Sequence, residues 1–287
     1  MFKAENWLDY TLIDASDGER LEKWGDYILI RPDPQIIWKS EKRNPLWKKA
    51  DGIYRRSSGG GGDWIVKNVP DNWTVNYKDI SFILSPMGFK HTGLFPEQAA
   101  NWDFITPLIK NEKRKIKMLN LFAYTGGATV AAAKAGAFVC HVDASKGMTN
   151  RAKQNAELSG IPSDGIRYIV DDCFKFIERE IKRGNKYDAV ILDPPSFGRG
   201  PKGERWIIEE NLDSLIERIS LILSDNPLFM ILNSYTTNLS PSTCGYILEK
   251  NIKNKFGGRV ISDELGIPVQ ESGLCLPCGA ASRWLKN

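Results

Sequence analysis

From about residue 116 to residue 235 the sequence alternates between short apolar runs and longer runs of helical composition. The apolar runs have the length and composition of buried strands: IKMLNLF, FVCHVDA, IRYIV, YDAVIL and LFMILNSY. The longer runs predict helices, among them RWIIEENLDSLIERISLILSD (205–225) and DCFKFIEREIKRG (172–184), in which Phe174, Ile177 and Ile181 are spaced along one face. Strands that alternate with helices over short connections form a parallel sheet that is covered on both faces. The pattern therefore predicts an α/β fold, and ligands in such folds bind at the carboxyl ends of the strands.

The first part of the chain has a different pattern. Short β-branched and aromatic runs such as YILIRPDPQIIW are broken by proline, Asp-Asn and glycine, and four consecutive glycines at 59–62 predict a loop. We interpret residues 1–85 as a β-rich N-terminal module, 86–115 as a linker and 116–287 as the α/β domain.

Composition narrows the class of protein. A net charge of +4 permits a nucleic-acid partner without requiring one. The sequence has no run of the roughly eighteen apolar residues that a membrane span needs, and no apolar core of a secretory signal. Five cysteines argue against a disulfide framework, and Cys275 and Cys278 form a single C-x-x-C without a second pair. We expect a cytoplasmic protein with no metal and no membrane partner.

The stretch from Arg31 to Arg56 is basic and aromatic. Eight lysines and arginines stand there against three acids, with Trp38, Trp47 and Tyr54 between them. Cations bind phosphates and aromatic rings stack on bases, so the stretch is consistent with an RNA contact. It is equally consistent with a solvated edge sheet whose aromatic residues face a small core.

The first strand of the α/β domain is followed by FAYTGGATVAAA (122–133). Gly126 and Gly127 permit a tight turn, and the helix after them presents free N–H groups at its positive end. The turn matches neither the dinucleotide fingerprint G-x-G-x-x-G nor the phosphate-binding loop.

Acidic residues follow the next three strands. Asp143 is placed to accept hydrogen bonds from two ribose hydroxyls, and Asp171 or Asp172 from an adenine amino group, although each could simply cap a helix. Asp193 opens the motif DPPSF. Three acids beside a Gly-Gly turn indicate an adenosine-containing cofactor without a pyrophosphate, and S-adenosylmethionine fits better than NAD.

Several motifs resemble those of the class I S-adenosylmethionine-dependent methyltransferases, and more narrowly the branch of bacterial large-subunit ribosomal RNA methyltransferases and its relatives. They run from about residue 88 to the C-terminus: HTGLFPEQAANW, NLFAYTGGATVAAAKAGA, VDASK, VDDCFKFI, DPPSFGRGPKGE and LNSYTT. The resemblance implies a Rossmann-like seven-stranded sheet, S-adenosylmethionine as cofactor and RNA as substrate. Relatives often carry a small RNA-binding β module at the N-terminus.

The resemblance also implies roles for individual residues. The turn after the first strand would wrap the methionine part of the cofactor, Asp143 would hold the ribose, and Asp172 with Cys173 would border the adenine. Residues 91–98 of the linker would cover the cofactor. The implied cofactor-binding set is Thr92, Phe95, Gln98, Phe122, Ala123, Tyr124, Thr125, Gly126, Gly127, Asp143, Ala144, Ser145, Asp172, Cys173 and Asp193.

The catalytic candidates lie in DPPSF. The Pro-Pro pair fixes the backbone, so Asp193 and the carbonyls near Pro194 and Pro195 could orient an acceptor amino group, and Phe197 could stack on a flat ring. In the family motif [DN]-P-P-[aromatic] the aromatic residue comes directly after the prolines, where this chain has Ser196. The offset leaves the stacking role of Phe197 open, and Pro-Pro could also merely end the strand.

Methylation at carbon 5 of cytosine requires a nucleophilic thiolate. Neither Ser196 nor the segment NSYTTNLS (233–240) supplies a cysteine, and Cys244 comes several residues later. We therefore expect a nitrogen or oxygen acceptor, with Asn233, Ser234 and Tyr235 as polar neighbours of the pocket. The sequence favours an RNA methyltransferase. The alternatives are a methyltransferase of a small molecule or protein side chain, and a non-catalytic RNA-binding protein.

Overall fold

The computed structural model describes residues 1–57, 61–88, 90–199 and 205–286, and of Arg199 only the backbone. The chain forms two compact units. Unit 1 comprises Met1–Phe2, Ala100–Leu265 and Cys278–Asn287, and unit 2 comprises Lys3–Ala99 and Gly266–Pro277. The predicted domain boundaries near residues 85 and 116 stay predictions.

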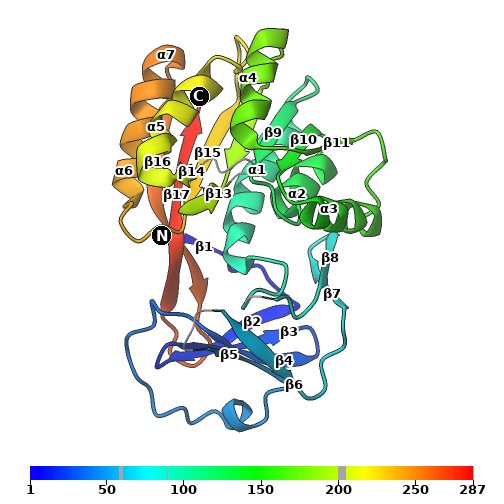
Figure 1. Ribbon diagram of the computed structural model, residues 1–287, viewed down its shortest axis with the longest axis vertical. Coiled ribbons are helices and arrows are strands. Elements are labelled where there is room, and N and C mark those ends of the chain that lie inside the picture. Colours follow the sequence, from blue (N-terminus) through cyan, green and yellow to red (C-terminus); the bar gives the residue numbers. More distant parts are fainter. Residues whose placement is uncertain (58–60, 89, 200–204, 287) are drawn as a thin grey trace. The chain divides into compact units, whose positions relative to one another are not determined.

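Unit 1 is built on an eight-stranded sheet with the order β1-β16-β17-β15-β12-β9-β10-β11 (Figure 1). From β11 through β10, β9 and β12 to β15, each strand pairs in parallel with the next, whereas β17 is antiparallel to β15. The predicted Rossmann-like sheet is confirmed, and the two-residue β1 adds an eighth strand. The strands are β1 (Phe2–Lys3), β9 (Lys117–Leu121), β10 (Phe138–Asp143), β11 (Ile166–Val170), β12 (Ala189–Leu192), β15 (Phe229–Ser234), β16 (Arg259–Pro268) and β17 (Cys275–Leu285).

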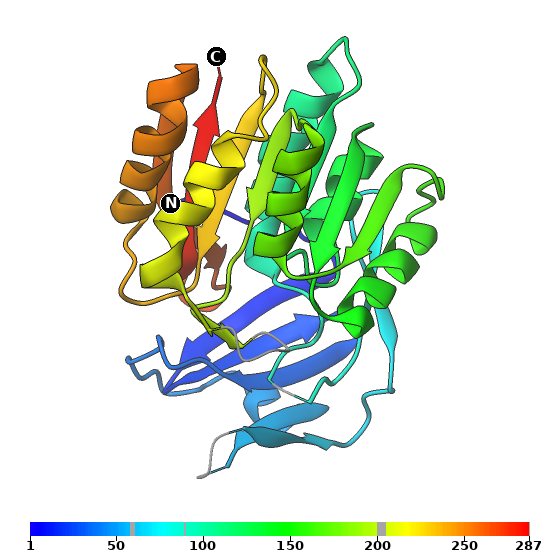
Figure 2. The same ribbon diagram turned by 45° about the horizontal axis from the view of Figure 1, so that its top comes forward.

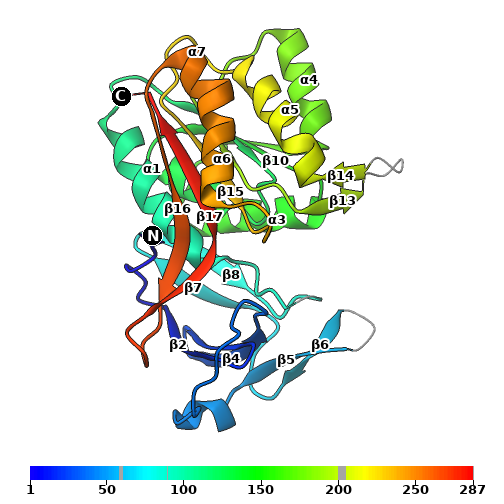
Figure 3. The ribbon, with the colours of Figure 1, turned by 90° about the vertical axis from the view of Figure 1, so that its left-hand side faces the viewer.

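Helices cover both faces of this sheet (Figures 1 and 3). Helices α1 (Ala99–Asn111), α2 (Gly127–Lys134) and α3 (Lys146–Leu158) lie on one face. Helices α4 (Cys173–Arg183), α5 (Ile208–Ser220) and α6 (Pro241–Leu248) lie on the other, and Glu249–Lys253 and α7 (Asn254–Phe256) extend α6. In Figure 2 this second layer stands in front of the strands. Right-handed crossovers produce this division, because α2 and α3 connect strands on one side of β9 and the later helices serve the other side. No helix among the described residues is long and apolar enough to cross a membrane.

One large apolar cluster of unit 1 lies between the sheet and the layer of α4 and α5. Ile177 of α4 and Leu215 of α5 are fully buried there against Val190 and Met230 of the sheet. Phe174 and Ile181 are partly buried and pack against the same cluster, so the apolar spacing of α4 in the sequence marks the face that the helix buries.

One sequence expectation was wrong. We expected a helix over 205–225, but Arg205–Ile207 form strand β14, which pairs antiparallel with β13 (Phe197–Arg199), and α5 begins at Ile208. The Ile208 amide donates to the carbonyl of Ser196 at 3.1 Å. Aromatic and β-branched residues favour a strand where a partner strand is at hand, and the pairing with β13 supplies that partner.

Unit 2 contains a five-stranded sheet and a separate hairpin, which confirms the β-rich N-terminal module (Figure 1). The sheet has the order β2-β3-β4-β5-β6, and only β4 and β5 are parallel. Its strands are β2 (Tyr10–Ser16), β3 (Glu19–Trp24), β4 (Tyr27–Pro32), β5 (Gly52–Arg56) and β6 (Gly62–Val66); the hairpin is β7 (Trp73–Tyr77) and β8 (Ile80–Leu84). Short 3-10 helices lie at Pro45–Lys48 and Pro96–Gln98.

Candidate active site

The carboxyl ends of four adjacent strands bring predicted site residues into one row. Leu121 of β9 lies beside Val142 of β10 and Leu192 of β12, and Leu192 lies beside Leu232 of β15. Strands β9 and β12 flank the point where the strand order reverses, which is where open α/β sheets bind ligands. The residues that follow these four form the next row at this edge: Phe122, Asp143, Asp193 and Asn233.

The turn after β9 has an unusual backbone. Phe122 and Tyr124 have φ angles of 54° and 50°, and Gly126, which caps α2, has φ of 84°. A Cβ at Gly126 would come within 2.8 Å of the Cβ of Ala152, and one at Gly127 within 2.7 Å of the Trp102 ring. Non-glycine residues in the left-handed region store strain, which concentrates at functional sites. The glycines are required here both by the turn and by the close packing around α2.

Buried hydrogen bonds hold the turn in this shape. The Ala123 amide donates to the carbonyl of Val142 at 3.1 Å. The side-chain amide of Asn155, which is fully buried, donates to the carbonyl of Thr125 at 2.9 Å. Sequence reasoning missed Asn155, because a single asparagine in a polar helical stretch gives no signal of a contact with a distant turn.

Asp143 is held by backbone amides. Its two carboxylate oxygens accept hydrogen bonds from the Tyr124 amide at 2.7 Å and from the Ser145 amide at 2.8 Å. Burial raises the pKa of Asp143, against the lowering effect of these two N–H groups. A carboxylate has about four acceptor positions, so two positions remain for donors from a ligand. The N-cap of α3 is Ser145 and not Asp143, because the Ser145 hydroxyl accepts a hydrogen bond from the Met148 amide.

Asp172 is the N-cap of α4, because its carboxylate accepts from the Lys175 amide at 2.9 Å. Asp171 forms an ion pair with Arg179. Cys173 is buried, and its sulfur accepts from the Phe122 amide at 3.4 Å. Cys173 therefore connects the end of β11 to the turn after β9, and the adenine contact implied for Asp172 stays a prediction.

The motif DPPSF is anchored within the protein. The carbonyl of Pro195 accepts from the Trp206 indole N–H at 2.5 Å, and that of Ser196 accepts from the Ile208 amide. We expected carbonyls around Pro195 to face outward as acceptors, but these two are engaged in β13–β14. Phe197 is 51% exposed, and the guanidinium of Arg205 lies 5.9 Å from its ring centroid.

Trp206 joins the DPPSF motif to the turn after β9. Besides bonding to Pro195, its ring lies 5.7 Å from that of Phe122 and 5.9 Å from that of Phe174. Sequence reasoning placed Trp206 in a helix and so missed it. A second tether fixes the motif, because the hydroxyls of Ser196 and Thr236 are 2.6 Å apart.

Asn233 and Ser234 are only 1% exposed, so the structure buries side chains that we expected as polar neighbours of a pocket. The Asn233 side-chain oxygen accepts from the Asn101 amide group at 2.9 Å. The Asn101 oxygen in turn accepts from Arg283 at 2.9 Å. This chain of hydrogen bonds ties the end of β15 to α1 and β17.

The predicted covering segment belongs to unit 2. Thr92 is fully buried, and its hydroxyl has no hydrogen-bond partner among the described residues. The ring of Phe95 lies 5.1 Å from that of His91, and the Gln98 amide donates to the carbonyl of Phe95. The implied contacts of Thr92, Phe95 and Gln98 with the cofactor stay predictions.

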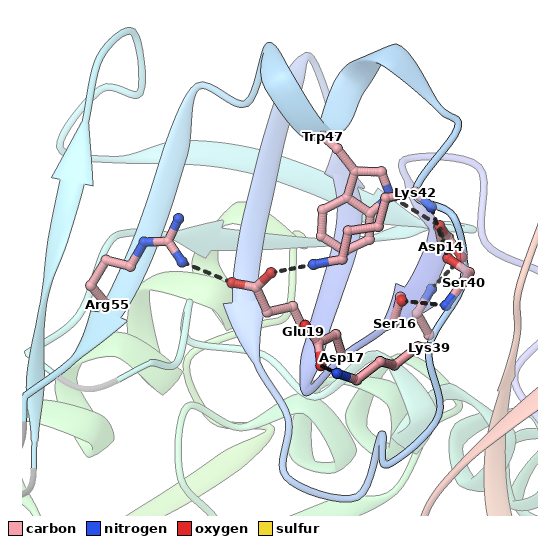
Figure 4. Close-up of polar contacts among 10 residues, drawn as sticks. Asp14, Ser16, Asp17, Glu19, Lys39, Ser40, Lys42, Trp47 and Arg55 are labelled. Carbon is pink, nitrogen blue, oxygen red and sulfur yellow. Dashed lines mark hydrogen bonds and ion pairs between the residues drawn. The ribbon is translucent and has the colours of Figure 1, made fainter.

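The basic stretch of unit 2 meets acids from β2, β3 and the turn between them (Figure 4). Glu19 binds Lys42 at 2.7 Å and Arg55 at 2.9 Å, and Asp17 lies 3.5 Å from Lys39. Two of the three aromatic side chains turn inward. Tyr54 is buried, and Trp47 packs against the small core and donates to Asp14. Trp38 is 42% exposed. The structure thus agrees with the second interpretation for Tyr54 and Trp47, and a role of the stretch in RNA binding stays a prediction.

Comparison with known proteins matches residues 43–237 to the model of the S-adenosylmethionine-dependent methyltransferase family. The chain is 34% identical to a crystal structure described as the SAM-dependent methyltransferase of Agrobacterium tumefaciens, with a TM-score of 0.94 over 99% of this chain and 93% of that one. It is also 33% identical to ribosomal RNA large subunit methyltransferase K/L of Shewanella woodyi and 36% identical to methyltransferase I of Aeromonas salmonicida.

These two ribosomal RNA methyltransferases are longer proteins. The matches cover 88% and 55% of this chain, but only 32% of the Shewanella protein and 38% of the Aeromonas protein. The family match, by contrast, spans the row of site residues from Phe122 to Asn233. The chain therefore belongs to the S-adenosylmethionine-dependent methyltransferases, and its cofactor is S-adenosylmethionine.

Proposed function

We propose that this protein transfers a methyl group to a nitrogen or oxygen atom of large-subunit ribosomal RNA, without a covalent cysteine intermediate. The observation that carries the proposal is the row of Phe122, Asp143 and Asp193 at the point where the strand order reverses. The two similar proteins described as ribosomal RNA methyltransferases support RNA as the substrate class.

The residues of the β9 and β10 ends fit the cofactor. Asp143 is anchored by two backbone amides and keeps acceptor positions for ribose hydroxyls. The turn from Phe122 to Gly126 brings backbone close to the same place, as the methionine part of the cofactor requires. When bound, the cofactor supplies an electrophilic methyl group on a sulfonium.

The acceptor side needs rigidity, because methyl transfer is an in-line displacement that depends on alignment of the acceptor atom. Trp206 and Thr236 hold the Pro-Pro corner through Pro195 and Ser196. We assign Asp193 the task of accepting a hydrogen bond from an N–H or O–H of the acceptor and orienting it. Phe197, which is half exposed, offers a flat surface for a base.

The cysteines support chemistry without a covalent adduct. Burial raises the pKa of Cys244 to about 11, and it also raises the pKa of Cys173, so both stay protonated thiols at neutral pH. A thiolate is the nucleophile that carbon-5 methylation of cytosine requires.

The direct test is to incubate the purified protein with tritiated S-adenosylmethionine and unmodified large-subunit ribosomal RNA. We expect label in the RNA, and mass spectrometry of the digested nucleosides should identify a nitrogen- or oxygen-methylated product. Label at carbon 5 of cytosine would contradict the acceptor class. No label in RNA, together with intact binding of S-adenosylhomocysteine by calorimetry, would contradict RNA as the substrate.

One observation favours the second candidate, methylation of a small molecule or protein side chain. Unit 2, the expected RNA-binding module, carries 14 lysines and arginines against 15 acids, whereas unit 1 carries 25 against 20. An RNA enzyme should lose substrate affinity steeply as salt increases, and a small-molecule enzyme should not. A salt series of substrate affinity therefore separates the two functions.

A further inference from the structure

Lys90 is a cation of unit 2 that the fold buries in part, without an acid beside it among the described residues. It is half-buried, and its ammonium donates to the carbonyl of Pro32 at 3.3 Å. Over the ranges that the structure describes, no carboxylate lies within ion-pair distance of this ammonium. Its own backbone carbonyl accepts from the guanidinium of Arg31 at 3.2 Å, so a second cation lies close by.

The acids around Lys90 are already engaged. Asp33 accepts from Arg20 at 2.6 Å, and Glu22, which is fully buried, accepts from Arg31 at 2.6 and 2.8 Å. Arg56 contributes a further positive charge to the surroundings of Lys90. Four cations therefore face two carboxylates at this place, although unit 2 as a whole is nearly balanced.

His91, the next residue, does not offset the excess. Burial lowers the pKa of His91 to about 4, with further lowering by Arg31, Lys90 and Arg20. The imidazole is therefore neutral at neutral pH. The surplus of positive charge rests on Lys90 and on Arg56, whose side chain is exposed.

Arg283 of unit 1 shows how the fold satisfies a buried cation without an acid. Its guanidinium donates to the Asn101 oxygen at 2.9 Å and to the Ala100 carbonyl at 3.0 Å. It also lies 3.7 and 4.4 Å from the ring centroids of Phe2 and Phe104. The Lys90 ammonium, by contrast, donates to one carbonyl, and no aromatic ring in the described part of the chain lies against it.

Removing a cation from water without a partner costs free energy, so an anion that arrives at such a place is bound favourably. Elsewhere in unit 2 the fold supplies an acid for the cation, as Asp17 does for Lys39 (Figure 4). We infer that Lys90 and Arg56, backed by Arg20 and Arg31, form an anion site that binds a backbone phosphate of the RNA substrate.

The inference rests on the proposed function, because it takes the phosphate to be that of RNA. Ammonium and guanidinium groups form charge-assisted hydrogen bonds with phosphate oxygens, and these contacts set affinity and its salt dependence without reading sequence. The site would thus position the RNA, and residues elsewhere would select the nucleotide.

The test compares the salt dependence of binding to in-vitro-transcribed, unmodified large-subunit ribosomal RNA for the full-length protein and its variants. For Lys90→Gln we expect the slope of log K against log salt to fall by about 0.7 to 0.9, the value for one lost phosphate contact. Lys90→Arg should keep the wild-type slope. Arg56→Gln, which removes an exposed charge and leaves the buried groups in place, should also reduce the slope.

The matched control is Lys39→Gln, because Asp17 pairs with Lys39 one to one and the slope should not change. Binding of S-adenosylhomocysteine should be the same in all variants. A wild-type slope for both Lys90→Gln and Arg56→Gln would overturn the phosphate site alone. Loss of S-adenosylhomocysteine affinity with an unchanged RNA slope would overturn it by assigning the anion site to the cofactor. A wild-type protein without salt-dependent RNA binding would overturn the proposed function as well.

Discussion

Asp143 in unit 1 and Glu22 in unit 2 are two carboxylates that the fold treats in opposite ways. Backbone N–H groups hold Asp143, and burial raises its pKa. Burial works to raise the pKa of Glu22 as well, but the charge and hydrogen bonds of Arg31 outweigh it and lower that pKa below 4.5. A carboxylate paired with an arginine is already satisfied, whereas one held by neutral amides keeps acceptor positions for a ligand.

The same contrast separates the two regions around these residues. At the carboxyl edge of the unit 1 sheet, amides and carbonyls of neighbouring turns position the polar groups. In unit 2, ion pairs of β3 with β4 and with the segment that follows β4 engage acids near the basic stretch. A high density of charged residues in the sequence therefore does not locate a binding site. A ligand is bound by the charged groups that the fold leaves without a partner.

The largest expected effect is on the stability of unit 2. Glu22→Gln leaves Arg31 buried without a counter-charge and should lower the free energy of unfolding by about 3 to 5 kcal/mol. The wild-type pair has a lowered carboxylate pKa, so it stabilises the fold above about pH 4.5 and loses this contribution as the pH falls through the pKa of folded Glu22. Urea unfolding at several pH values checks both statements. Asp17→Asn, an exposed acid, is the control, and an equal small loss in both variants would contradict the comparison.

Next in size is the loss of methyl transfer in Asp193→Ala. We expect a fall in kcat of about 100-fold or more, because the acceptor is no longer aligned, with S-adenosylhomocysteine binding largely intact. Single-turnover kinetics and calorimetry measure the two quantities separately. An equal loss of both would place Asp193 in the cofactor site instead.

Asp143→Asn should weaken S-adenosylhomocysteine binding by about 10- to 100-fold. In asparagine an NH2 group, which donates, replaces one of the two oxygens that accept from backbone N–H groups. The hydrogen bond that this oxygen would accept from a ribose hydroxyl is lost as well. The wild-type affinity should also decline as the pH falls toward the pKa of Asp143, which lies above 3.8. Calorimetry over a pH series tests this, with Asp213→Asn, an acid of α5 that pairs with Lys250, as the control. If the affinity of Asp143→Asn for S-adenosylhomocysteine were unchanged, Asp143 would be a structural carboxylate like Glu22 and would not be a ligand-binding one.

Trp206→Phe should lower kcat by about threefold to tenfold, the effect of one hydrogen bond, while KM for the cofactor and thermal stability stay near wild type. The phenylalanine ring retains much of the packing against Phe122 and Phe174, so the variant isolates the bond to Pro195. Trp206→Leu, which loses the rings as well, should impair both kinetics and stability. A fall in stability with an unchanged kcat in Trp206→Phe would show a purely structural role.

The smallest effect should come from Lys42→Gln. Its partner Glu19 keeps Arg55, and surface ion pairs contribute little, so we expect a change below about 1 kcal/mol in the free energy of unfolding. Denaturant unfolding beside Glu22→Gln gives the comparison directly. A loss as large as that of Glu22→Gln would mean that exposed pairs, too, hold unit 2 together.

Much of unit 1 was predictable because its signals are local. The apolar runs at 116–122, 138–144 and 187–192 contain β9, β10 and β12, with Asp143 as the last residue of β10 and Asp193 directly after β12. The spacing of α4 likewise gave its buried face. Trp206 was not predictable, because the residues of β14 became a strand only through pairing with β13.

The sequence by itself determined the order of strands and helices, and hence that the glycine turn and the acids of the strand ends share one edge, since the carboxyl ends of parallel strands always do. Only the tertiary structure decided that Glu19 and Glu22 form ion pairs with cations of the basic stretch. It also decided that Asn155 and Trp206 bond to the two turns of the candidate site, and that Lys90 has no carboxylate partner among the described residues. These contacts join residues far apart in the chain. Composition and periodicity carry no record of such pairs, because each depends on how whole elements pack.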